Sequence, residues 1–322
     1  MTVLCRTLLA VFALFFASAA QAQNYPDRPI RLIAPFPAGG LADVLARAVG
    51  DEMSKTLGQP VIVENRAGAG GNTGADAVAK ATPDGYTLLM ASAGILTANP
   101  FLYAQMPFNV ETAFIPVSNV ADMSMLVVVN PKVEAKTLKE FVALAKAQPG
   151  KLNFGSPGIG TTGHLGLAML MHAADLKIAH VPYRGAAPAI TDLIAGQIDG
   201  VVDNPPTVIA HIQSGKLRPL AVAAKARMAL LPDVPTAAEQ GVANYEASSW
   251  FGIAAPAGTP PANVARLHRS IAAAVRTPAM QERFSKSGAR LIGDSPQEFA
   301  ARIGAERVMW GRIIKAANIA PQ

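Results

Sequence analysis

The chain has 322 residues, of which 51% are hydrophobic and 16% charged, and its formal net charge at neutral pH is +6. This composition excludes a disordered polar chain and leaves room for two ordinary domains. The positive charge is scattered rather than gathered in a basic stripe, so nucleic acid is not an expected partner. Cys5 is the only cysteine, which excludes a disulfide framework, a thiol nucleophile and a thiolate metal site.

The first 22 residues have the features of a signal peptide. Arg6 gives a short basic start, residues 8–16 are almost wholly apolar, and Ala20-Gln21-Ala22 fits the small-x-small cleavage rule. The apolar run is shorter than the roughly 20 residues that a membrane span needs. We therefore expect export of the chain and cleavage after Ala22.

Strand and helix patterns alternate along the rest of the chain, which favours an α/β fold with parallel sheets. The first half predicts strands at 30–34, 60–64 and 86–91, with helices at 41–53 and 73–81. The second half predicts strands at 151–154, 178–181 and 198–202, with helices at 161–174 and 188–195. The matching order predicts an internal duplication.

Two apolar segments, 125–129 and 250–254, follow the two halves and are expected to cross between two lobes as a hinge. The stretch from 260 onward is mostly helical and is expected to return to the first lobe. The predicted fold class is α/β, with two doubly wound lobes joined by two crossing strands. Residues 23–124 and 251–322 would form lobe 1, and residues 125–250 would form lobe 2.

A glycine turn joins a strand to a helix in each half, at 35–40 and at 155–160. A helix start leaves unpaired N–H groups and a partial positive charge, and glycine lets the backbone approach a ligand closely. Two such anion sockets predict a protein that holds a carboxylate from both sides.

Motifs of enzymes are incomplete. The segment Gly158–Gly163 fits G-x-G-x-x-G, but the next strand ends in Pro182-Tyr183 rather than in an acid that would bind a ribose. Ser156 lacks the glycine two residues earlier that a nucleophile elbow needs, and Pro157 removes a possible oxyanion donor. The histidines form no close ligand pair. We expect no catalysis, no cofactor and no metal, and keep a periplasmic hydrolase that uses Ser156 as an alternative.

Three polar residues lie near the expected cleft. Asp203 closes an apolar strand and could accept a hydrogen bond from a ligand amine or hydroxyl. Ser92 holds the matching place in the first half and could donate to a carboxylate. His164 lies in the first helical turn after the second glycine turn. The roles of three charged residues stay open: Asp43, Arg66 and Arg184.

Several motifs occur in order along nearly the whole mature chain. They are Tyr25-Pro26-x-Arg28-Pro29-Ile30, Pro35-Phe36-x-x-Gly39-Gly40-x-x-Asp43, Val63-Glu64-Asn65-Arg66-x-Gly68-Ala69-Gly70-Gly71, Pro83-Asp84-Gly85-Tyr86-Thr87-Leu88, Val181-Pro182-Tyr183-Arg184-Gly185, Gly196-Gln197-Ile198-Asp199 and Leu231-Pro232-Asp233-Val234-Pro235-Thr236. Together they resemble the Bug (Bordetella uptake gene) or TctC-type proteins, the periplasmic solute receptors of tripartite tricarboxylate transporters.

The resemblance implies a two-lobed, type II-like periplasmic binding fold that closes on one ligand, with the carboxylate held between the glycine turns mainly by backbone amides. The ligand-binding residues it implies are Phe36, Pro37, Ala38, Gly39 and Gly40 from lobe 1, Ser156, Gly160, Thr161, Thr162 and His164 from lobe 2, and Ser92 and Asp203 toward the far end of the ligand. Many relatives carry a hydroxyl residue where this chain has Leu41 and Ala42, so the first socket is expected to work through its backbone.

The predicted function is capture of a small carboxylate, which could be a dicarboxylate, a tricarboxylate, an amino acid or an aromatic acid. The expected partners are this ligand and the membrane permease subunits of a tripartite transporter, and the expected state is a monomer. A ligand-sensing receptor for a two-component sensor kinase is the second alternative.

Overall fold

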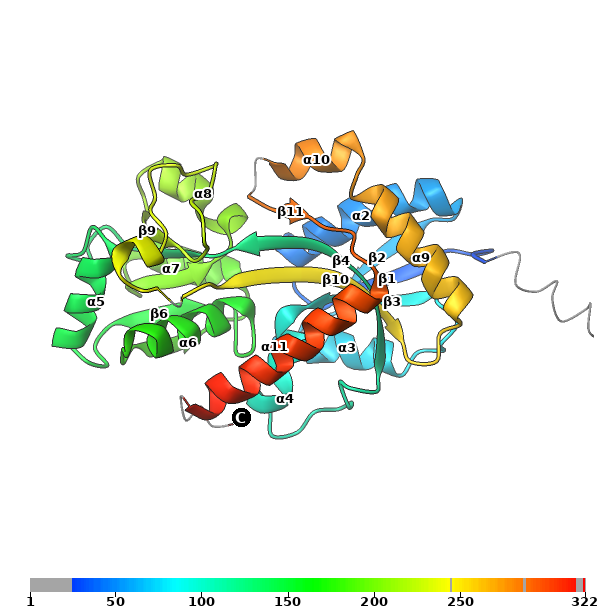
Figure 1. Ribbon diagram of the computed structural model, residues 1–322, viewed down its shortest axis with the longest axis horizontal. Helices are drawn as coiled ribbons and strands as arrows, with labels where there is room; N and C mark the ends of the chain where they lie inside the picture. Colours follow the sequence, from blue (N-terminus) through cyan, green and yellow to red (C-terminus); the bar gives the residue numbers. More distant parts are fainter. Residues whose placement is uncertain (1–24, 244, 286–287, 317–320, 322) are drawn as a thin grey trace, which may run out of the picture.

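The computed structural model describes residues 25–243, 245–285, 288–316 and 321. The expected signal peptide and its cleavage after Ala22 lie outside the described residues. Two β-sheets, each flanked by helices, form two lobes that lie side by side (Figure 1). This arrangement confirms the predicted α/β class with two lobes. No helix of the described ranges is both long and apolar enough to cross a membrane.

Lobe 1 is built on a six-stranded sheet in the order β11-β4-β10-β3-β1-β2. Its strands are β1 (Ile30–Ala34), β2 (Val61–Asn65), β3 (Thr87–Ser92), β4 (Phe114–Ser124), β10 (Ser248–Pro256) and β11 (Arg290–Leu291). Its helices are α2 (Leu41–Leu57), α3 (Asn72–Ala79), α4 (Asn99–Leu102), α9 (Pro261–Ala274), α10 (Pro278–Ser285) and α11 (Pro296–Ala316). Segments from both ends of the described chain therefore build this lobe.

Lobe 2 is built on a five-stranded sheet in the order β7-β6-β8-β5-β9. Its strands are β5 (Leu126–Val129), β6 (Asn153–Ser156), β7 (Ala179–Pro182), β8 (Gly200–Asp203) and β9 (Arg218–Val222). Its helices are α5 (Leu138–Ala147), α6 (Thr162–Ala174), α7 (Ala186–Ala195) and α8 (Pro205–Gln213). The lobe boundary expected at 124/125 falls at the end of β4, and the one expected at 250/251 falls inside β10. Both stay a prediction.

The two sheets share one topology. Strands β2, β1 and β3 of lobe 1 run parallel, as do β7, β6 and β8 of lobe 2, and in both sheets the next strand, β10 or β5, is antiparallel. This agreement supports the predicted duplication. The sheets are mixed rather than parallel throughout, because strands near the lobe junction run against the βαβ strands.

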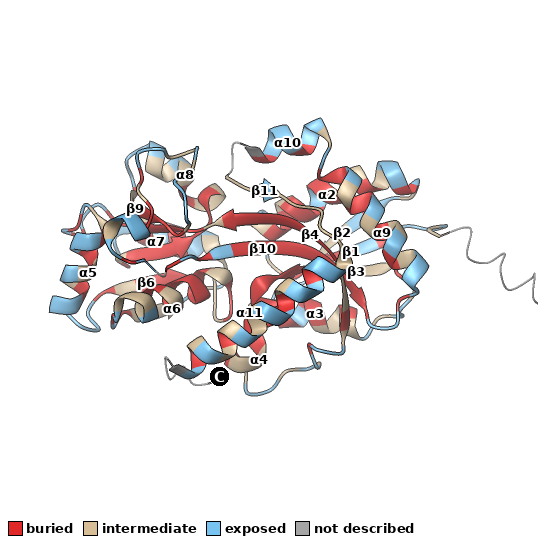
Figure 2. Cartoon of the chain, viewed as in Figure 1, coloured by how far each residue is buried: buried red, intermediate tan, exposed pale blue. Residues whose placement is uncertain are grey.

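The chain passes between the lobes twice. Strand β4 leads through Met125 into β5, and the approach to β10 runs beside it, so that two long buried strands bridge the molecule (Figures 1 and 2). Met125 accepts a backbone hydrogen bond from Ala223 and donates one to Ala247, each 2.9 Å long. The bond to Ala247 ties the two crossing segments together, which confirms the predicted pair of crossing strands. The crossings lie just before the predicted segments, because residues 126–129 pair within the lobe 2 sheet and residues 250–254 within the lobe 1 sheet.

Helix α2 shows how the sequence fixes an element that starts at the lobe junction. Ala42, Leu45, Ala46, Val49 and Met53 recur at helical spacing, and all five are buried against lobe 1. Burial of each larger apolar side chain contributes roughly 1.5–3 kcal/mol. The packing of this stripe therefore sets the position of the helix start.

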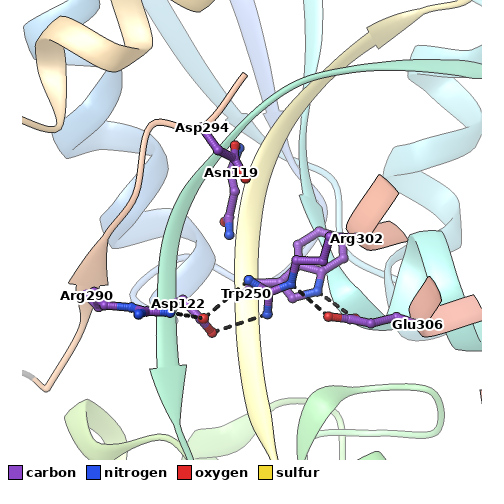
Figure 3. Close-up of polar contacts among 7 residues, drawn as sticks. All are labelled: Asn119, Asp122, Trp250, Arg290, Asp294, Arg302 and Glu306. Carbon is purple, nitrogen blue, oxygen red and sulfur yellow. Dashed lines mark hydrogen bonds and ion pairs between the residues drawn. The ribbon is translucent and has the colours of Figure 1, made fainter. Parts of the chain in front are cut away.

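Helix α11 is fixed to both crossing strands by polar contacts (Figure 3). Arg302 Nη1 lies 3.2 Å from Asp122 Oδ2 on β4, and Arg302 Nε lies 2.8 Å from Glu306 Oε1. Glu306 also accepts a 2.7 Å hydrogen bond from the indole N–H of Trp250 on β10. Arg290 of β11 is a second cation on Asp122, at 3.1 Å. The helix is thus held against the crossing strands β4 and β10 of lobe 1.

Apolar side chains of the two lobes meet beside the crossing strands. This interlobe seam consists of Ala98, Leu102, Leu165, Trp310 and Ile314. Leu165 belongs to α6 of lobe 2, while the other four belong to lobe 1. Next to the seam, the Tyr103 hydroxyl donates a 3.0 Å hydrogen bond to the Ile159 carbonyl across the lobes.

Candidate functional site

The two lobes enclose a cleft of about 570 Å³. The cleft lies at the carboxyl ends of parallel strands, where open α/β sheets bind ligands. Ser92 at the end of β3 and Asp203 at the end of β8 both lie in its wall. Its lining comprises Phe36, Pro37, Ala38, Gly39, Gly40, Leu41, Ala42, Ser92 and Phe251 from lobe 1, and Pro157, Thr161, Thr162, Arg184, Gly185, Ala186, Ala187, Pro188, Ile190, Thr191, Ile194, Asp203, Asn204, Thr207 and His211 from lobe 2.

Four helices begin at this cleft. Their N-cap residues, which precede the first helical turn, all line it: Gly40 of α2, Thr161 of α6, Gly185 of α7 and Asn204 of α8. None of these four residues caps its helix with a side-chain hydrogen bond. Helix α8 begins with two prolines, which have no N–H, so it contributes its dipole alone. The other three starts offer unpaired N–H groups as well as a partial positive charge.

Of the helices that begin away from the cleft, α5 and α11 are capped by side chains, whereas α3, α4 and α9 are not. Thr137 accepts a 3.1 Å hydrogen bond from the Glu140 N–H at the start of α5. Ser295 accepts one of 3.2 Å from the Glu298 N–H at the start of α11. A ligand carboxylate in the cleft can take the place of such a capping oxygen.

Asp43 supports the first glycine turn. Its Oδ2 accepts a 2.9 Å hydrogen bond from the Gly39 N–H, and its Oδ1 accepts one of 2.9 Å from Asn65 Nδ2 and lies 2.8 Å from Arg47 Nη2. Burial alone would raise the pKa of Asp43, but the hydrogen bonds from Gly39, Arg47 and Asn65 together lower it. Asp43 is therefore an ionised brace of the turn.

The hydrogen bond to Asp43 limits which backbone N–H groups of the first socket are open to a ligand. The Gly39 N–H is taken by Asp43, and the Gly40 N–H donates to Pro37 O at 3.3 Å. The N–H groups of Leu41 and Ala42 belong to the first turn of α2, which has no intrahelical acceptor for them. The donors that this socket offers to a ligand are thus the backbone N–H groups of Leu41 and Ala42, whose side chains carry no hydroxyl.

The second glycine turn rests on two histidines. Ser156 Oγ lies 2.6 Å from His180 Nε2 and accepts a 3.2 Å hydrogen bond from the Gly158 N–H. The Gly160 N–H donates to His164 Nδ1 at 3.2 Å, and the two imidazole rings stack with centroids 4.2 Å apart. Burial lowers the pKa of His164 to about 3, helped by the neighbouring His180, and burial lowers the pKa of His180 to about 4. Both imidazoles are therefore neutral near pH 7.

Most residues predicted to bind ligand line the cleft, but three do not. Ser156, Gly160 and His164 lie outside the lining. Ser156 is fully buried and does not line the cleft, so its hydroxyl is not placed to meet a ligand there, although its Oγ lies 2.6 Å from His180 Nε2. The residues that do line the cleft are Phe36, Pro37, Ala38, Gly39, Gly40, Ser92, Thr161, Thr162 and Asp203. Ligand contact by each of these stays a prediction.

The charged residues whose roles were open differ in position. Arg184 lines the cleft, whereas Arg66 lies 3.6 Å from Glu64 on the surface of lobe 1. Sequence reasoning missed the cleft-facing residues of α7 and α8. The glycine before α7 and the Asn-Pro step before α8 are helix-start signals that would have indicated them.

Two α/β lobes that are joined by crossing strands and enclose a cleft surrounded by helix starts define a two-lobed solute-binding protein. The family model described as "Tripartite tricarboxylate transporter family receptor" matches residues 45–319. The protein BugT of Bordetella pertussis is 38% identical over 314 residues, which cover 96% of each chain. This chain therefore belongs to the tripartite tricarboxylate transporter receptor family, which confirms the resemblance seen in the sequence.

Solved structures agree with this assignment. R. palustris Rpa4515 with adipate has a TM-score of 0.87 and 34% identity, covering 92% of this chain and all of that one. MatC (Rpa3494) from Rhodopseudomonas palustris with bound malate has a TM-score of 0.85 and 31% identity, covering 90% of this chain and all of that one. The predicted periplasmic binding protein fold is thereby confirmed.

Proposed function

We propose that this protein is a periplasmic receptor that captures a small carboxylate in the interlobe cleft and delivers it to a tripartite tricarboxylate-type membrane transporter. The observation that carries the proposal is the group of four helix starts without side-chain caps around one cleft. Similar proteins whose structures hold adipate or malate support this ligand class. The protein binds its ligand without chemical turnover.

Binding energy comes from backbone donors and from apolar burial. Charge-assisted hydrogen bonds from N–H groups of α2, α6 and α7 are about twice as strong as neutral ones. Apolar side chains such as Phe36 and Phe251 line the same cleft and bury the body of the ligand. A few such contacts suffice for a dissociation constant near 1 μM, which corresponds to about −8 kcal/mol.

The test uses one position at the start of α6. Thr162 is the first residue of α6 and lines the cleft. Thr162→Asp adds a negative charge that favours the helix start but repels a ligand carboxylate, whereas Thr162→Asn of similar size adds none. Isothermal titration with adipate, malate and aromatic monocarboxylates should show binding to the wild type and to Thr162→Asn, and a loss of about 100-fold or more for Thr162→Asp.

Unfolding temperature is the control for that experiment, because Thr162→Asp should unfold at the same temperature as Thr162→Asn or higher. Failure of every carboxylate to bind, or equal binding by the two variants, would contradict the proposal. Delivery to a transporter is tested in cells that lack the gene. Loss of labelled-ligand uptake supports delivery, and intact uptake with lost induction of ligand-responsive genes would instead identify a sensor.

A further inference from the structure

Asp203 is a buried carboxylate in the cleft wall that the capture of a carboxylate does not itself require. It ends β8, the central strand of the lobe 2 sheet, and only 3% of it is exposed. Its Oδ1 accepts a 2.7 Å hydrogen bond from the Asn204 N–H. No ion pair recorded for the described part of the chain includes it. A buried charge without a cation is costly, so it is rarely retained without a purpose.

The fold itself does not demand a charge at this position. The hydrogen bond from Asn204 could be accepted equally well by the amide oxygen of an asparagine. Burial raises the pKa of Asp203 to about 6, while the hydrogen bond from the Asn204 N–H opposes that rise. At neutral pH the side chain is therefore mainly an ionised acceptor that lines the cleft.

The surroundings of Asp203 restrict the ligand group that can face it. A second ligand carboxylate would meet a like charge at close range. An ammonium group would be repelled by the partial positive charge that four helix starts direct into the cleft. Apart from Asp203, the ionisable residues of the lining are Arg184 and His211, and neither supplies a negative charge to offset that repulsion. A neutral hydroxyl donates a hydrogen bond to the carboxylate and avoids both costs.

The rest of the lining favours an apolar ligand body. Phe36, Leu41 and Phe251 approach from lobe 1, and Ile190 and Ile194 from lobe 2. We propose that the ligand is a hydroxy acid with an apolar body, whose carboxylate faces the helix starts while its hydroxyl donates to Asp203. Asp203 is then the residue that selects the hydroxyl. This inference rests on the proposed function, since it names the substrate class of the same cleft.

The experiment compares ligands that differ at one end only. Hexanoate, 6-hydroxyhexanoate, 6-aminohexanoate and adipate share a six-carbon chain and end in a methyl, hydroxyl, ammonium or carboxylate group. Benzoate and 4-hydroxybenzoate form an aromatic pair. Titration of the full-length protein should show that the hydroxy acid of at least one series binds about 10-fold or more tightly than every partner of its series, as expected for one hydrogen bond to a charged group.

Two variants assign that preference to Asp203. Asp203→Asn keeps an acceptor for Asn204 but replaces one carboxylate oxygen with a donor, so it should lose the hydroxyl preference and gain affinity for adipate. Asp199→Asn is the control, because Asp199 near the opposite end of β8 accepts a 2.7 Å hydrogen bond from the Asn153 N–H but does not line the cleft. It should leave the ranking unchanged.

The possible outcomes separate this inference from the function on which it rests. If the acids bind but neither hydroxy acid leads its series, the hydroxyl inference is wrong while carboxylate capture stands. If Asp203→Asn keeps the wild-type ranking, Asp203 does not select the hydroxyl. If none of the acids binds the wild type, both fail. The wild-type series decides the ligand class even if Asp203→Asn does not fold.

Discussion

Replacing Gly160 with alanine should weaken ligand binding by forcing the lobes apart. Gly160 has a φ of +75°, and a Cβ at this position would overlap with Oδ1 of Asn99 in lobe 1. Asn99 cannot easily move aside, because its Nδ2 donates a 2.6 Å hydrogen bond to Asn72. The left-handed backbone costs an alanine about 1–2 kcal/mol in any state of the protein. The overlap adds about 1–3 kcal/mol only where the lobes are in contact.

The resemblance implies lobes that close on the ligand, so the second cost is expected to fall on ligand binding, and the dissociation constant should rise about 10- to 100-fold. Gly58→Ala is the matched control, because Gly58 has a φ of +73° and a Cβ there would have no atom within 4 Å. Both variants should lose similar stability in thermal unfolding without ligand, but only Gly160→Ala should lose affinity in calorimetric titration. Adding Asn99→Ala to Gly160→Ala should restore most of the affinity. Equal affinities of Gly160→Ala and Gly58→Ala would refute the overlap between lobes.

Three further changes test other contacts. Leu165→Ala in the interlobe seam should lower the free energy of unfolding in urea by about 2–5 kcal/mol and also weaken ligand binding. Leu167→Ala, in the core of lobe 2, should lower stability alone. A normal ligand affinity of Leu165→Ala would contradict this expectation. Asp43→Ala should cost about 1.5–3 kcal/mol above pH 5. Because the folded pKa of Asp43 is lowered, the difference in unfolding free energy between wild type and Asp43→Ala should vanish as pH falls through about 4 and below. Asp51 is exposed, so the control Asp51→Ala should change stability little at any pH. His180 has a folded pKa of about 4, so its protonation in the unfolded chain should lower the free energy of unfolding of the wild type by up to about 1.4 kcal/mol per pH unit between pH 6.5 and 4. His180→Gln should remove this contribution to the slope. An unchanged slope would assign the loss to other groups.

The βαβ strands were predictable because short apolar runs stand between glycine turns. Strand β1 has the bounds that its pattern indicates, and helix α2 extends only one turn further than expected. Strand β4 was not predicted, because Ser118, Asn119 and Asp122 interrupt its apolar pattern. These side chains are buried by β10, β11 and α11, which lie far along the sequence. A polar strand of this kind is visible only when its partners are in place.

The sequence located the two glycine turns of the cleft but not the contacts beneath them. Spacing cannot reveal that Ser156 meets His180, because parallel pairing of β6 with β7 brings these residues together. Asn65 reaches Asp43 for the same reason, through the pairing of β1 with β2. The start of α7 was missed because its helix was expected to begin at residue 188, and α8 was missed because no helix was expected directly after the strand at 198–202. Strand register, rather than residue type, therefore decides which side chains support the site.

The strand order of lobe 1 also favours one order of folding events. Lobe 2 uses one continuous stretch of chain between the crossing strands, so all its pairings are available together. Lobe 1 must join β3 to β10 and cover β4 with α11, across the whole of lobe 2. Contacts of such long sequence separation form slowly. A refolding chain is thus expected to complete lobe 2 first and to leave the apolar edge of β3 exposed until β10 arrives.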